Sequence, residues 1–574
     1  MKKIIKYLFL LTGGSFILAS CNDFLDREPL DSVTPDNFFF TENDLAAYAV
    51  KHYNFTTHEG FNAGIWRNDN ATDNQAATDY DKKWIPGQWK VPEAYDNPAS
   101  NDPWYFSAIR EANYFLETVV PRFEKGEIEG SETNIKHYIG EMYFLRAKNY
   151  LSKLETFGDF PIIKNTLPDE SASLIQASKR EPRHKVARFI LEDLDLAIGL
   201  LTNTISGGKN RITQNAALLL KSRAALYEAS WLTYHKGTAL VPGGPGWPGK
   251  AEDIADFNID TEIAFFLKEA KAAAKEVIGN AALVQNTAKD CMDETVKTDE
   301  DKYKMSNPYF AQFSANSLEG YSEILLWRAY NLLDYKIVHS APFYIRVGGN
   351  TGFTRQYVES FLCRDGKPIY ATDQYKGDES LSDVRKNRDL RLQLFLMTSG
   401  ETLSPNVMNG TPDLLPEVPQ LLDITEKRCV TGYQVRKGLS GNWYRDGNTA
   451  IEGCPVYRVA EAYLNYIEAD CMEHNGTSIG SEAAGYWGDL RERAGLPRDY
   501  TVTVNNTDLS KELDWAVYSA GKTVSPLLYN IRRERRCELL AEGLRMLDLK
   551  RWRALDQVKQ FVIQGVNLWE SDLK

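Results

Sequence analysis

Cysteine is scarce in this chain, with seven residues among 574. Apart from Cys21, the cysteines are spread along the second half and none forms a C-x-x-C pair: Cys291, Cys363, Cys429, Cys454, Cys471 and Cys537. This spacing supports neither a structural zinc site nor a redox-active dithiol. In an exported protein some of these thiols could pair as disulfides, but the spacing does not say which.

Histidine is equally rare, and its seven residues include no H-E-x-x-H pattern, so a zinc protease has no support. No EF-hand-like loop indicates a Ca²⁺ site either. We therefore expect no metal and no cofactor. A glycoside hydrolase stays open as an alternative, because it needs only two carboxylates and the chain has 79 acidic residues from which to draw them.

Long apolar runs are missing except at the N-terminus. There the 13 uncharged residues Tyr7–Ala19 follow three lysines. As a helix they would span about 20 Å, against about 30 Å of membrane hydrocarbon, which suits a secretory signal rather than a transmembrane helix. Leu18-Ala19-Ser20-Cys21 then resembles the lipobox of bacterial lipoproteins. We expect residues 1–20 to be removed and Cys21 to carry a lipid anchor; ordinary secretory cleavage is the alternative.

Positive charge is in deficit. The chain has 67 basic and 79 acidic residues, and without the three leader lysines the balance is 64 − 79 = −15. Such a protein gains little from releasing counterions, so we expect no nucleic-acid partner. The one basic run, Arg532–Arg536, is interleaved with apolar residues. It predicts a packed helix whose arginines pair internally with Glu534, Glu538 and Glu542.

Apolar residues recur at helical spacing in several windows. Examples are the faces that begin at Ile139, Val186, Ala217, Ile263 and Val459. Small alanines facing large aromatics favour close helix-on-helix packing, and the paired windows are typical of tetratricopeptide-like hairpins, without a strict repeat. The sequence therefore predicts a mainly α fold.

Gly, Pro, Asn and Asp punctuate the chain between Ile278 and Arg458, which is typical of loops. We expect a single domain, 21–574, with a helical scaffold at about 21–278 and 455–574. An irregular, loop-rich lobe is inserted at about 279–454. Loops on a rigid scaffold commonly carry binding sites.

Aromatic residues are in surplus between Trp66 and Phe106, interleaved with Asp, Asn and Gln. Trp84 and Trp89 lie among Lys, Pro, Gly and Gln residues, a composition that is typical of loops. Flat rings suit the C–H face of a sugar, and short polar side chains suit its hydroxyl groups. The alternative is that these tryptophans pin the loop to the scaffold, and the residues leave both interpretations open.

Several windows together resemble the SusD/RagB family of outer-membrane nutrient-binding lipoproteins, with coverage from Cys21 to about Trp552. The windows, in chain order, are "CNDFLD" with the following "REPLDSVTPDNFFFTENDLAAYAVKHYN", "YFLRAKNYLSKLETFGDFPII", "EILLW", "NRDLRL", "YRVAEAYLNYIEAD", "LRERAGLP" and "IRRERRCELLAEGLRMLDLKRW". The last window is the most specific.

This resemblance implies an α-helical fold of tetratricopeptide-like hairpins with an irregular lobe. It implies a lipid-anchored protein on the outer face of the outer membrane, forming a lid on a SusC-like TonB-dependent transporter. Such a protein captures oligosaccharides, or peptides in some members, without catalysis. The alternatives are a surface glycoside hydrolase and a peptide-capturing member of the same family.

The resemblance also indicates where the ligand should bind, by region rather than by an invariant motif. The first region implies stacking by Trp84 and Trp89, with Tyr80 and Asp73 nearby. The second region follows the "EILL" segment and adds three further residues: Trp327, Arg328 and Tyr330. We expect the aromatic residues to stack on the ligand, and Asp73 and Arg328 to form hydrogen bonds to its hydroxyl groups.

Overall fold

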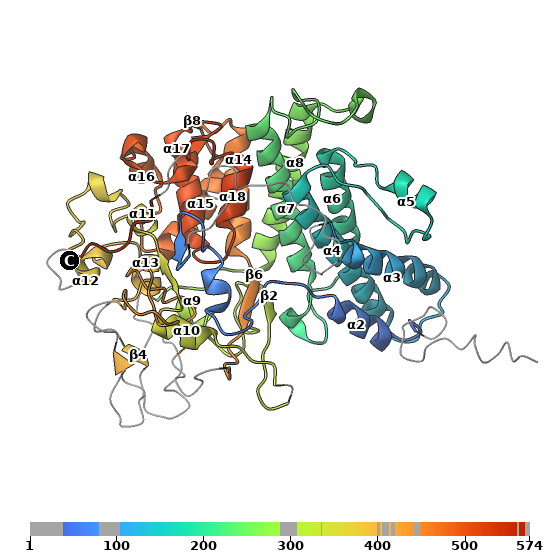
Figure 1. Ribbon diagram of the computed structural model, residues 1–574, viewed down its shortest axis with the longest axis horizontal. Helices are drawn as coiled ribbons and strands as arrows, with labels where there is room; N and C mark the ends of the chain where they lie inside the picture. The colour runs from blue at the N-terminus through green and yellow to red at the C-terminus, as the bar shows by residue number, and fades with distance from the viewer. Residues whose placement is uncertain are drawn as a thin grey trace, which may run out of the picture.

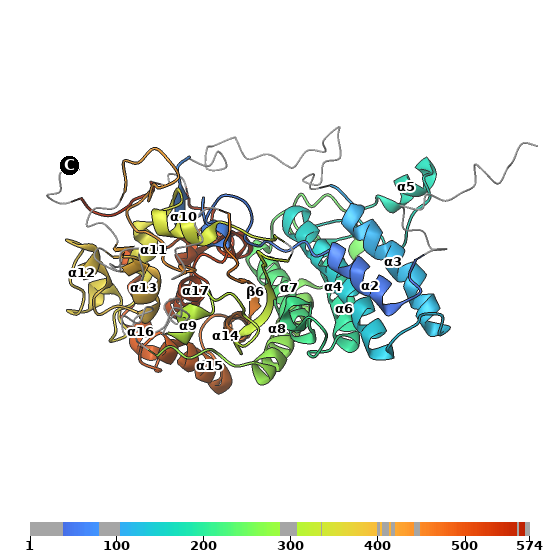
Figure 2. The same cartoon turned by 90° about the horizontal axis from the view of Figure 1, so that it is seen from below.

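The computed structural model describes residues 38–79, 104–287, 307–334, 336–398, 402–404, 413–414, 420–440, 448–558 and 562–568. Helices carry the architecture, and the strands form two-stranded antiparallel pairs. This confirms the predicted mainly α class. Figure 2 shows long helices at one end of the long axis and short elements at the other, with α14 between them.

The first half of the chain forms a layer of helices (Figure 1). These are α2 (Glu42–Lys51), α3 (Ser107–Glu124), α4 (Glu132–Phe157), α5 (Ser171–Ala177), α6 (Arg183–Leu200), α7 (Gln214–His235) and α8 (Ile259–Asn280). Helix α3 packs on α4, α4 on α6, α6 on α7 and α7 on α8. The predicted apolar faces are buried here; in α6, for example, Val186, Ile190 and Leu194 have no exposed surface. Burial of these faces forms the larger apolar core.

Local signals mark the ends of these helices. Thr41 begins α2 with a capping box: its hydroxyl accepts from the Asp44 backbone N–H (3.3 Å), and the Asp44 carboxylate accepts from the Thr41 N–H (3.0 Å). Helix α4 ends at Gly158, whose φ of +74° favours glycine. These ends are encoded by residues within a few positions of each other, so they can be found from sequence.

Short elements make up residues 307–458. The helices are α9 (Pro308–Ala311), α10 (Ala341–Val347), α11 (Arg355–Ser360), α12 (Leu381–Arg385) and α13 (Leu390–Phe395). The strands are β1 (Gln75–Ala77), which pairs with β3 (Thr351–Phe353), β2 (Ile324–Arg328), which pairs with β6 (Cys454–Arg458), and β4 (Thr402–Ser404), which pairs with β5 (Asp413–Leu414). The β1–β3 pair joins the N-terminal segment to this part of the chain, which has its own aromatic-rich core.

The C-terminal part returns to helices. These are α14 (Ala460–Glu473), α15 (Ser481–Arg493), α16 (Thr501–Asn505), α17 (Pro526–Glu538) and α18 (Arg545–Arg551), with the short pair β7 (Tyr518–Ser519) and β8 (Lys522–Thr523). Short 3₁₀ helices occur along the whole chain: η2 (Gly64–Arg67), η4 (Gly208–Asn210), η5 (Ala251–Ile254), η7 (Ile369–Ala371), η8 (Leu509–Lys511) and η9 (Trp515–Val517). Helix α14 packs on α7, α8, α15 and α17, so it joins the two helical parts.

Helix α17 carries the predicted basic run, and nearly all of it is buried. The prediction of a packed helix is confirmed, but the prediction of internal charge pairing is wrong. The partners come from other segments: Arg533 pairs with Glu512, Arg535 with Asp548 and Arg536 with Asp514, while Glu534 pairs with Arg391 and Glu538 with Arg458 and Arg493. Tertiary packing brings opposite charges from distant segments closer than helical spacing does.

Five of the cysteines lie in the described residues, and all five are buried free thiols: Cys363, Cys429, Cys454, Cys471 and Cys537. Cys21 and Cys291 lie outside the described residues. Within the described ranges, no helix combines the length and the apolar character needed to cross a membrane. The same ranges contain no group of three His, Cys, Asp or Glu residues arranged to hold a metal ion.

Candidate functional site

Three of the predicted ligand contacts, Tyr80, Trp84 and Trp89, lie outside the described residues. Their roles in stacking stay predictions. All three belong to residues 80–103, which follow β1 and precede α3 in the chain and are not among the described residues. The four remaining predicted contacts, Asp73, Trp327, Arg328 and Tyr330, lie within the described residues.

Asp73 is buried, with 1% of its surface exposed. The guanidinium of Arg545 donates to both carboxylate oxygens, at 2.8 and 2.7 Å, and Arg536 lies 3.2 Å from one of them. These bonds attach the N-terminal segment to α17 and α18. A ligand could reach the carboxylate only after this cluster opened, so the ligand role of Asp73 stays a prediction that the buried geometry does not favour.

Trp327 and Tyr330 are also buried. The Trp327 indole N–H donates to the Glu319 carboxylate (3.1 Å), and its ring packs with Leu318. The Tyr330 hydroxyl donates to the His58 carbonyl (2.8 Å), and burial holds the pKa of this hydroxyl well above its usual value. Both rings are occupied by neighbours, so stacking on a ligand would require them to rearrange.

Arg328 is different because it is partly exposed at the end of β2. Its guanidinium lies 5.6 Å from the centre of the Tyr330 ring, and its buried Nε has no hydrogen-bond partner among the described residues. A ligand would therefore have to contact the outer nitrogens of the guanidinium rather than Nε. A guanidinium with a spare donor can bind a hydroxyl or an anion. Arg328 is thus the predicted contact that retains hydrogen-bonding capacity in the described structure.

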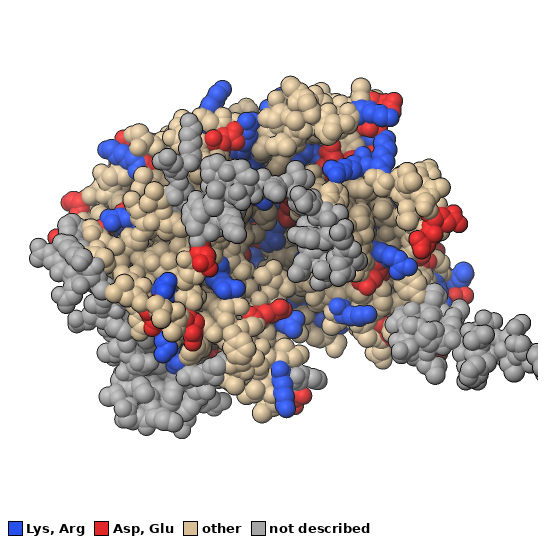
Figure 3. All heavy atoms as spheres, viewed as in Figure 1, with Lys and Arg blue, Asp and Glu red and all other residues tan. Residues whose placement is uncertain are grey.

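A cavity of about 410 Å³ lies between the long helices and the C-terminal helices. Its walls come from the segment at Phe55, from α4, α7, β6 and α14, and from the turn between α17 and α18. We call it the central hollow. Pro455 lines it and also pairs with Trp327, so the β2–β6 pair carries the second predicted region to its edge. Figure 3 shows a hollow near the middle of this face, with charged atoms at its base.

The turn that closes the central hollow depends on a glycine. Gly543 has a φ of +81°, a left-handed conformation, and a Cβ at this position would lie 2.8 Å from the Cβ of Asn68. Any larger residue would both strain the backbone and push the two segments apart. This residue lies within the last window quoted above, "AEGLRMLDLKRW".

Two bidentate ion pairs line the hollow. Arg223 on α7 donates to both oxygens of Glu461 on α14, at 2.7 and 2.6 Å. Arg458 on β6 donates to Glu542 at 2.6 to 3.0 Å, and the pKa of Glu542 is lowered by Arg458 and then Lys437, against the desolvation that would raise it. Both carboxylates already accept two hydrogen bonds or more from an arginine.

Lys148 and Glu155 on α4 provide less constrained charges. The Lys148 ammonium donates to the backbone and side-chain oxygens of Asn54, at 2.9 and 3.0 Å, and forms no ion pair within 4 Å among the described residues. Desolvation, reinforced by Arg223, lowers its pKa to about 8. Desolvation also raises the pKa of Glu155 to about 7, against the attraction of Arg223 and Lys148. Both groups stay partly accessible.

Sequence reasoning did not select Lys148, Arg223 or Glu461. Each lies next to a buried alanine in the sequence (Ala147, Ala224 and Ala462), but neighbouring residues of a helix point about 100° apart, so the apolar faces did not single out these charges. The spacing could not show that α4, α7 and α14 meet around one cavity.

Two family models match the chain. One, described as the SusD family, matches residues 296–567, and the other, described as starch-binding and associating with the outer membrane, matches residues 23–226. A sequence relative, SusD-like protein P2 of Formosa agariphila, is 27% identical over 557 residues, which covers 94% of this chain and 89% of that protein.

Solved structures share the fold. A SusD-like carbohydrate-binding protein of Bacteroides fragilis has a TM-score of 0.63 at 19% identity, covering 93% of this chain and 91% of its own. Another SusD-like protein of that species has a TM-score of 0.59 at 22% identity, covering 92% and 89%. A third, solved with a xylogluco-oligosaccharide, has a TM-score of 0.52 at 17% identity, covering 89% and 82%. With both family models and this shared fold in agreement, the chain belongs to the SusD/RagB family.

Proposed function

We propose that this chain is a non-catalytic cell-surface lipoprotein that captures oligosaccharides and delivers them to a SusC-like TonB-dependent transporter. A lipid on Cys21 would hold it at the outer face of the outer membrane. The observation that carries the proposal is the agreement of two SusD-type models along both halves of the chain. The solved relative with a bound xylogluco-oligosaccharide supports a glycan ligand.

Capture requires contacts rather than chemistry. Trp84, Trp89 and Tyr80 would supply flat faces for sugar rings, and Arg328 would donate to hydroxyl groups. Lys148 would add a donor inside the central hollow. Because the transporter confines the released ligand close to its pore, a modest affinity is sufficient. The contact with the transporter should be broad, as in permanent complexes.

The two carboxylates that line the hollow, Glu461 and Glu542, and the nearby Glu155 support binding over glycoside hydrolysis. A glycosidase needs a second carboxylate that can act as nucleophile or base beside its general acid. Glu155 has the raised pKa of an acid, but Glu461 is tied to Arg223 and Glu542 to Arg458. One further motif, Gly476–Gly480 ("GTSIG"), matches the G-x-S-x-G spacing of hydrolases, yet it joins two helices, whereas a nucleophile elbow joins a strand to a helix.

The test is a glycan array with the purified mature chain, followed by calorimetry on the best-bound oligosaccharide and on a xylogluco-oligosaccharide. We expect Trp84→Ala, Trp89→Ala, Arg328→Gln and Lys148→Met each to weaken binding about tenfold, or about 1.4 kcal/mol. The control is Lys136→Met, an exposed position on the same helix as Lys148, which should leave the affinity unchanged.

Three outcomes would contradict this function. Binding of peptides but of no glycan would favour the peptide-capturing alternative. Cleavage of a labelled glycan that is lost in Glu155→Gln would favour a hydrolase. Failure of the lipidated chain to co-purify with a TonB-dependent transporter from outer membranes would remove the delivery role.

A further inference from the structure

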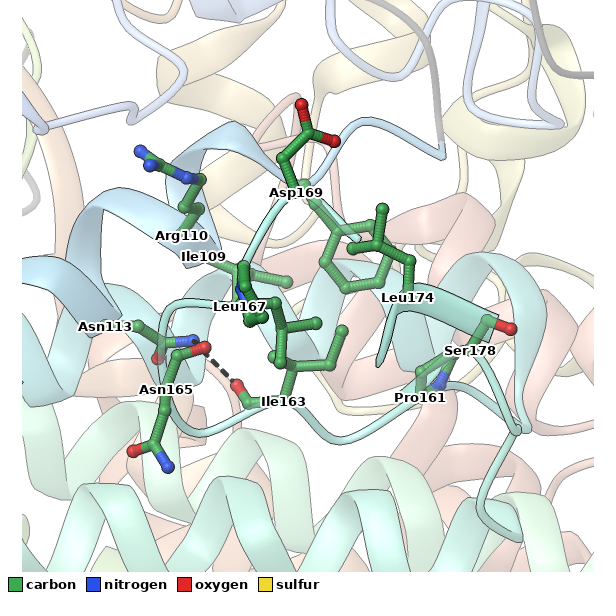
Figure 4. Close-up of a pocket in the computed structure, with 12 residues that line it drawn as sticks. Ile109, Arg110, Asn113, Pro161, Ile163, Asn165, Leu167, Asp169, Leu174 and Ser178 are labelled. Carbon is green, nitrogen blue, oxygen red and sulfur yellow. Dashed lines mark hydrogen bonds between the residues drawn. The ribbon is translucent and has the colours of Figure 1, made fainter. Parts of the chain in front are cut away.

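A second cavity, of about 530 Å³, lies at the far end of the long helices (Figure 4). Helix α3 forms one wall and the segment between α4 and α6 forms the rest. This segment is a loop closed at its neck by an antiparallel bridge, in which Phe160 and Glu181 exchange two backbone hydrogen bonds of 3.1 Å. We call residues 161–180 the flap. The cavity shares no lining residue with the central hollow.

One leg of the flap is fixed near its start, and the other is held beyond α5, where Lys179 pairs with Asp253 (2.6 Å) and Arg180 lies over the Trp104 ring. Ile163 forms two backbone bonds to the Tyr150 hydroxyl, at 2.8 and 3.1 Å, and the Thr166 N–H donates to Glu117 (2.9 Å). Helix α5, on the other leg, has no buried residue; Leu174 is 42% exposed and Ile175 is 73% exposed. Few contacts hold α5 in place, so it is the part of the flap that can move most readily over a ligand.

The interior of the cavity is mainly apolar, and Asn113, the one buried polar side chain among its described lining residues, is already hydrogen-bonded. Seven side chains supply the apolar walls: Phe106, Ile109, Pro161, Ile163, Leu167, Pro168 and Leu174. The Asn113 amide donates to the Ile163 and Asn165 carbonyls, at 2.9 and 3.2 Å, and its oxygen accepts from Arg146 (2.9 Å). A sugar ring would find few partners for its many hydroxyl groups there, whereas an aliphatic or aromatic group would be well accommodated.

Charge is confined to the mouth of the cavity. Figure 4 shows Arg110 from α3 and Asp169 from the flap on the same side, with their charged ends directed away from the apolar walls. Both residues are exposed, and neither has a hydrogen-bond or ion-pair partner among the described residues. The site thus offers an apolar chamber with one free cation and one free anion at its entrance.

We propose that this cavity binds a zwitterionic amino acid with an apolar side chain. The side chain would fill the chamber, the carboxylate would bind Arg110 and the ammonium group would bind Asp169. This ligand class matches the site because it joins adjacent opposite charges to one compact apolar group. The cavity volume lies in the range of small-molecule sites, which is roughly 300–1,000 Å³.

Calorimetry on the purified mature chain tests this with L-phenylalanine and L-leucine. N-acetyl-phenylalanine lacks the cation, phenylalanine amide lacks the anion, and octanoate is an apolar anion without a cation. We expect saturable binding of both amino acids and about tenfold weaker binding of the three analogues. The dipeptides Phe-Gly and Gly-Phe separate the two charges by one peptide unit, so both should bind more weakly than phenylalanine. Tighter binding of either dipeptide would overturn the proposal.

Variants at the mouth make the test specific. Arg110→Gln should abolish the preference for phenylalanine over its amide, and Asp169→Asn should abolish the preference over the N-acetyl form. Lys125→Gln, at the residue that follows α3, and Glu170→Gln on the flap are exposed controls that do not line the cavity and should retain both preferences. Leu174→Ser should weaken all ligands equally, and bound phenylalanine should slow hydrogen exchange in α5.

The proposal is overturned if neither amino acid binds saturably up to millimolar concentration. It is also overturned if octanoate or N-acetyl-phenylalanine binds as tightly as phenylalanine, or if the mouth variants keep the wild-type preferences. These results are independent of glycan binding, because the central hollow and the predicted tryptophans are unchanged in every variant used here.

Discussion

Helices α6 and α17 are both buried, but their buried side chains differ in kind. In α6 most of them are aliphatic or aromatic, and the exceptions include Asp193, which is held by Arg146. In α17 the buried set includes four arginines and two glutamates: Arg532, Arg533, Arg535, Arg536, Glu534 and Glu538. The first helix is stabilised by removing apolar surface from water, and the second by ion pairs that offset the desolvation of its charges.

This difference shows what a sequence pattern can reveal. The apolar face of α6 needs only another apolar face, so its spacing is informative on its own. Three arginines of α17 each need a particular carboxylate, and the fourth, Arg532, needs the Ala516 carbonyl and the Ser519 hydroxyl. These partners come from several other segments. The long helices should therefore tolerate changes that keep their volume, whereas the C-terminal core should be sensitive to the loss of any one charge.

The largest expected effect is that of Glu538→Gln. The Glu538 carboxylate accepts hydrogen bonds from Arg458 (2.7 Å), Arg493 (2.6 Å) and Arg391 (3.1 Å), so its loss leaves three buried arginines undercompensated. We expect the free energy of unfolding to fall by about 4 kcal/mol, measured by urea denaturation. Glu276→Gln, at an exposed position on α8, is the control and should cost less than about 1 kcal/mol. Equal costs would contradict the role assigned to the buried ion pairs.

The next effect concerns the apolar core. Leu194→Ala on α6 removes a side chain with no exposed surface and leaves a cavity, so we expect a loss of about 3 kcal/mol in urea denaturation. Leu196 lies on the same helix and is 49% exposed, so Leu196→Ala should change stability by no more than about 0.5 kcal/mol. A similar loss in both variants would mean that the periodic face is not what stabilises this half.

A fall in pH should destabilise α17 and α6 over different pH ranges. Neighbouring arginines hold the pKa values of Glu538, Asp514 and Asp548 below their ordinary values, against desolvation. A depressed folded pKa contributes stability above the unfolded value of about 4, and this stability is lost as the pH falls below it. At pH 3.5 we expect α17 to lose roughly 2 kcal/mol of hydrogen-exchange protection. Helix α6 should lose protection earlier, between pH 6.5 and about 4, because desolvation lowers the pKa of the buried His184 to about 4. Losses in both helices over the same pH range would contradict this assignment.

The smallest effect is that of Glu155→Gln at the edge of the central hollow. Burial raises the pKa of Glu155 to about 7, so its contribution to stability is complete below the unfolded pKa and is lost as the pH rises through 7. The neutral amide avoids this loss. We expect the variant to be about 1 kcal/mol more stable than the parent at pH 8 and equal to it at pH 4, by thermal unfolding. Glu132→Gln, exposed on the same helix, should show no such gain at pH 8.

The helices and the family could be predicted, because their signals are local or collective. The faces around Val186 and Val459 identified α6 and α14, and the quoted windows indicated the SusD/RagB resemblance. The site could be predicted only by region. Asp73 and Tyr330 look like exposed loop residues in the sequence, yet their partners Arg545 and His58 lie hundreds of residues away and bury them. Arg328 retained a spare donor because its strand ends at an edge.

The sequence by itself determined where the helices run, which of their faces are apolar, and to which family the chain belongs. Only the tertiary structure decided which charges meet, that Lys148 and Arg223 share one hollow, and that α5 covers an apolar chamber with Arg110 at its mouth. The physical reason is the sequence separation over which each kind of interaction acts. Helical periodicity arises between residues a few positions apart, whereas ion pairs and cavities depend on how distant segments pack after the chain has folded.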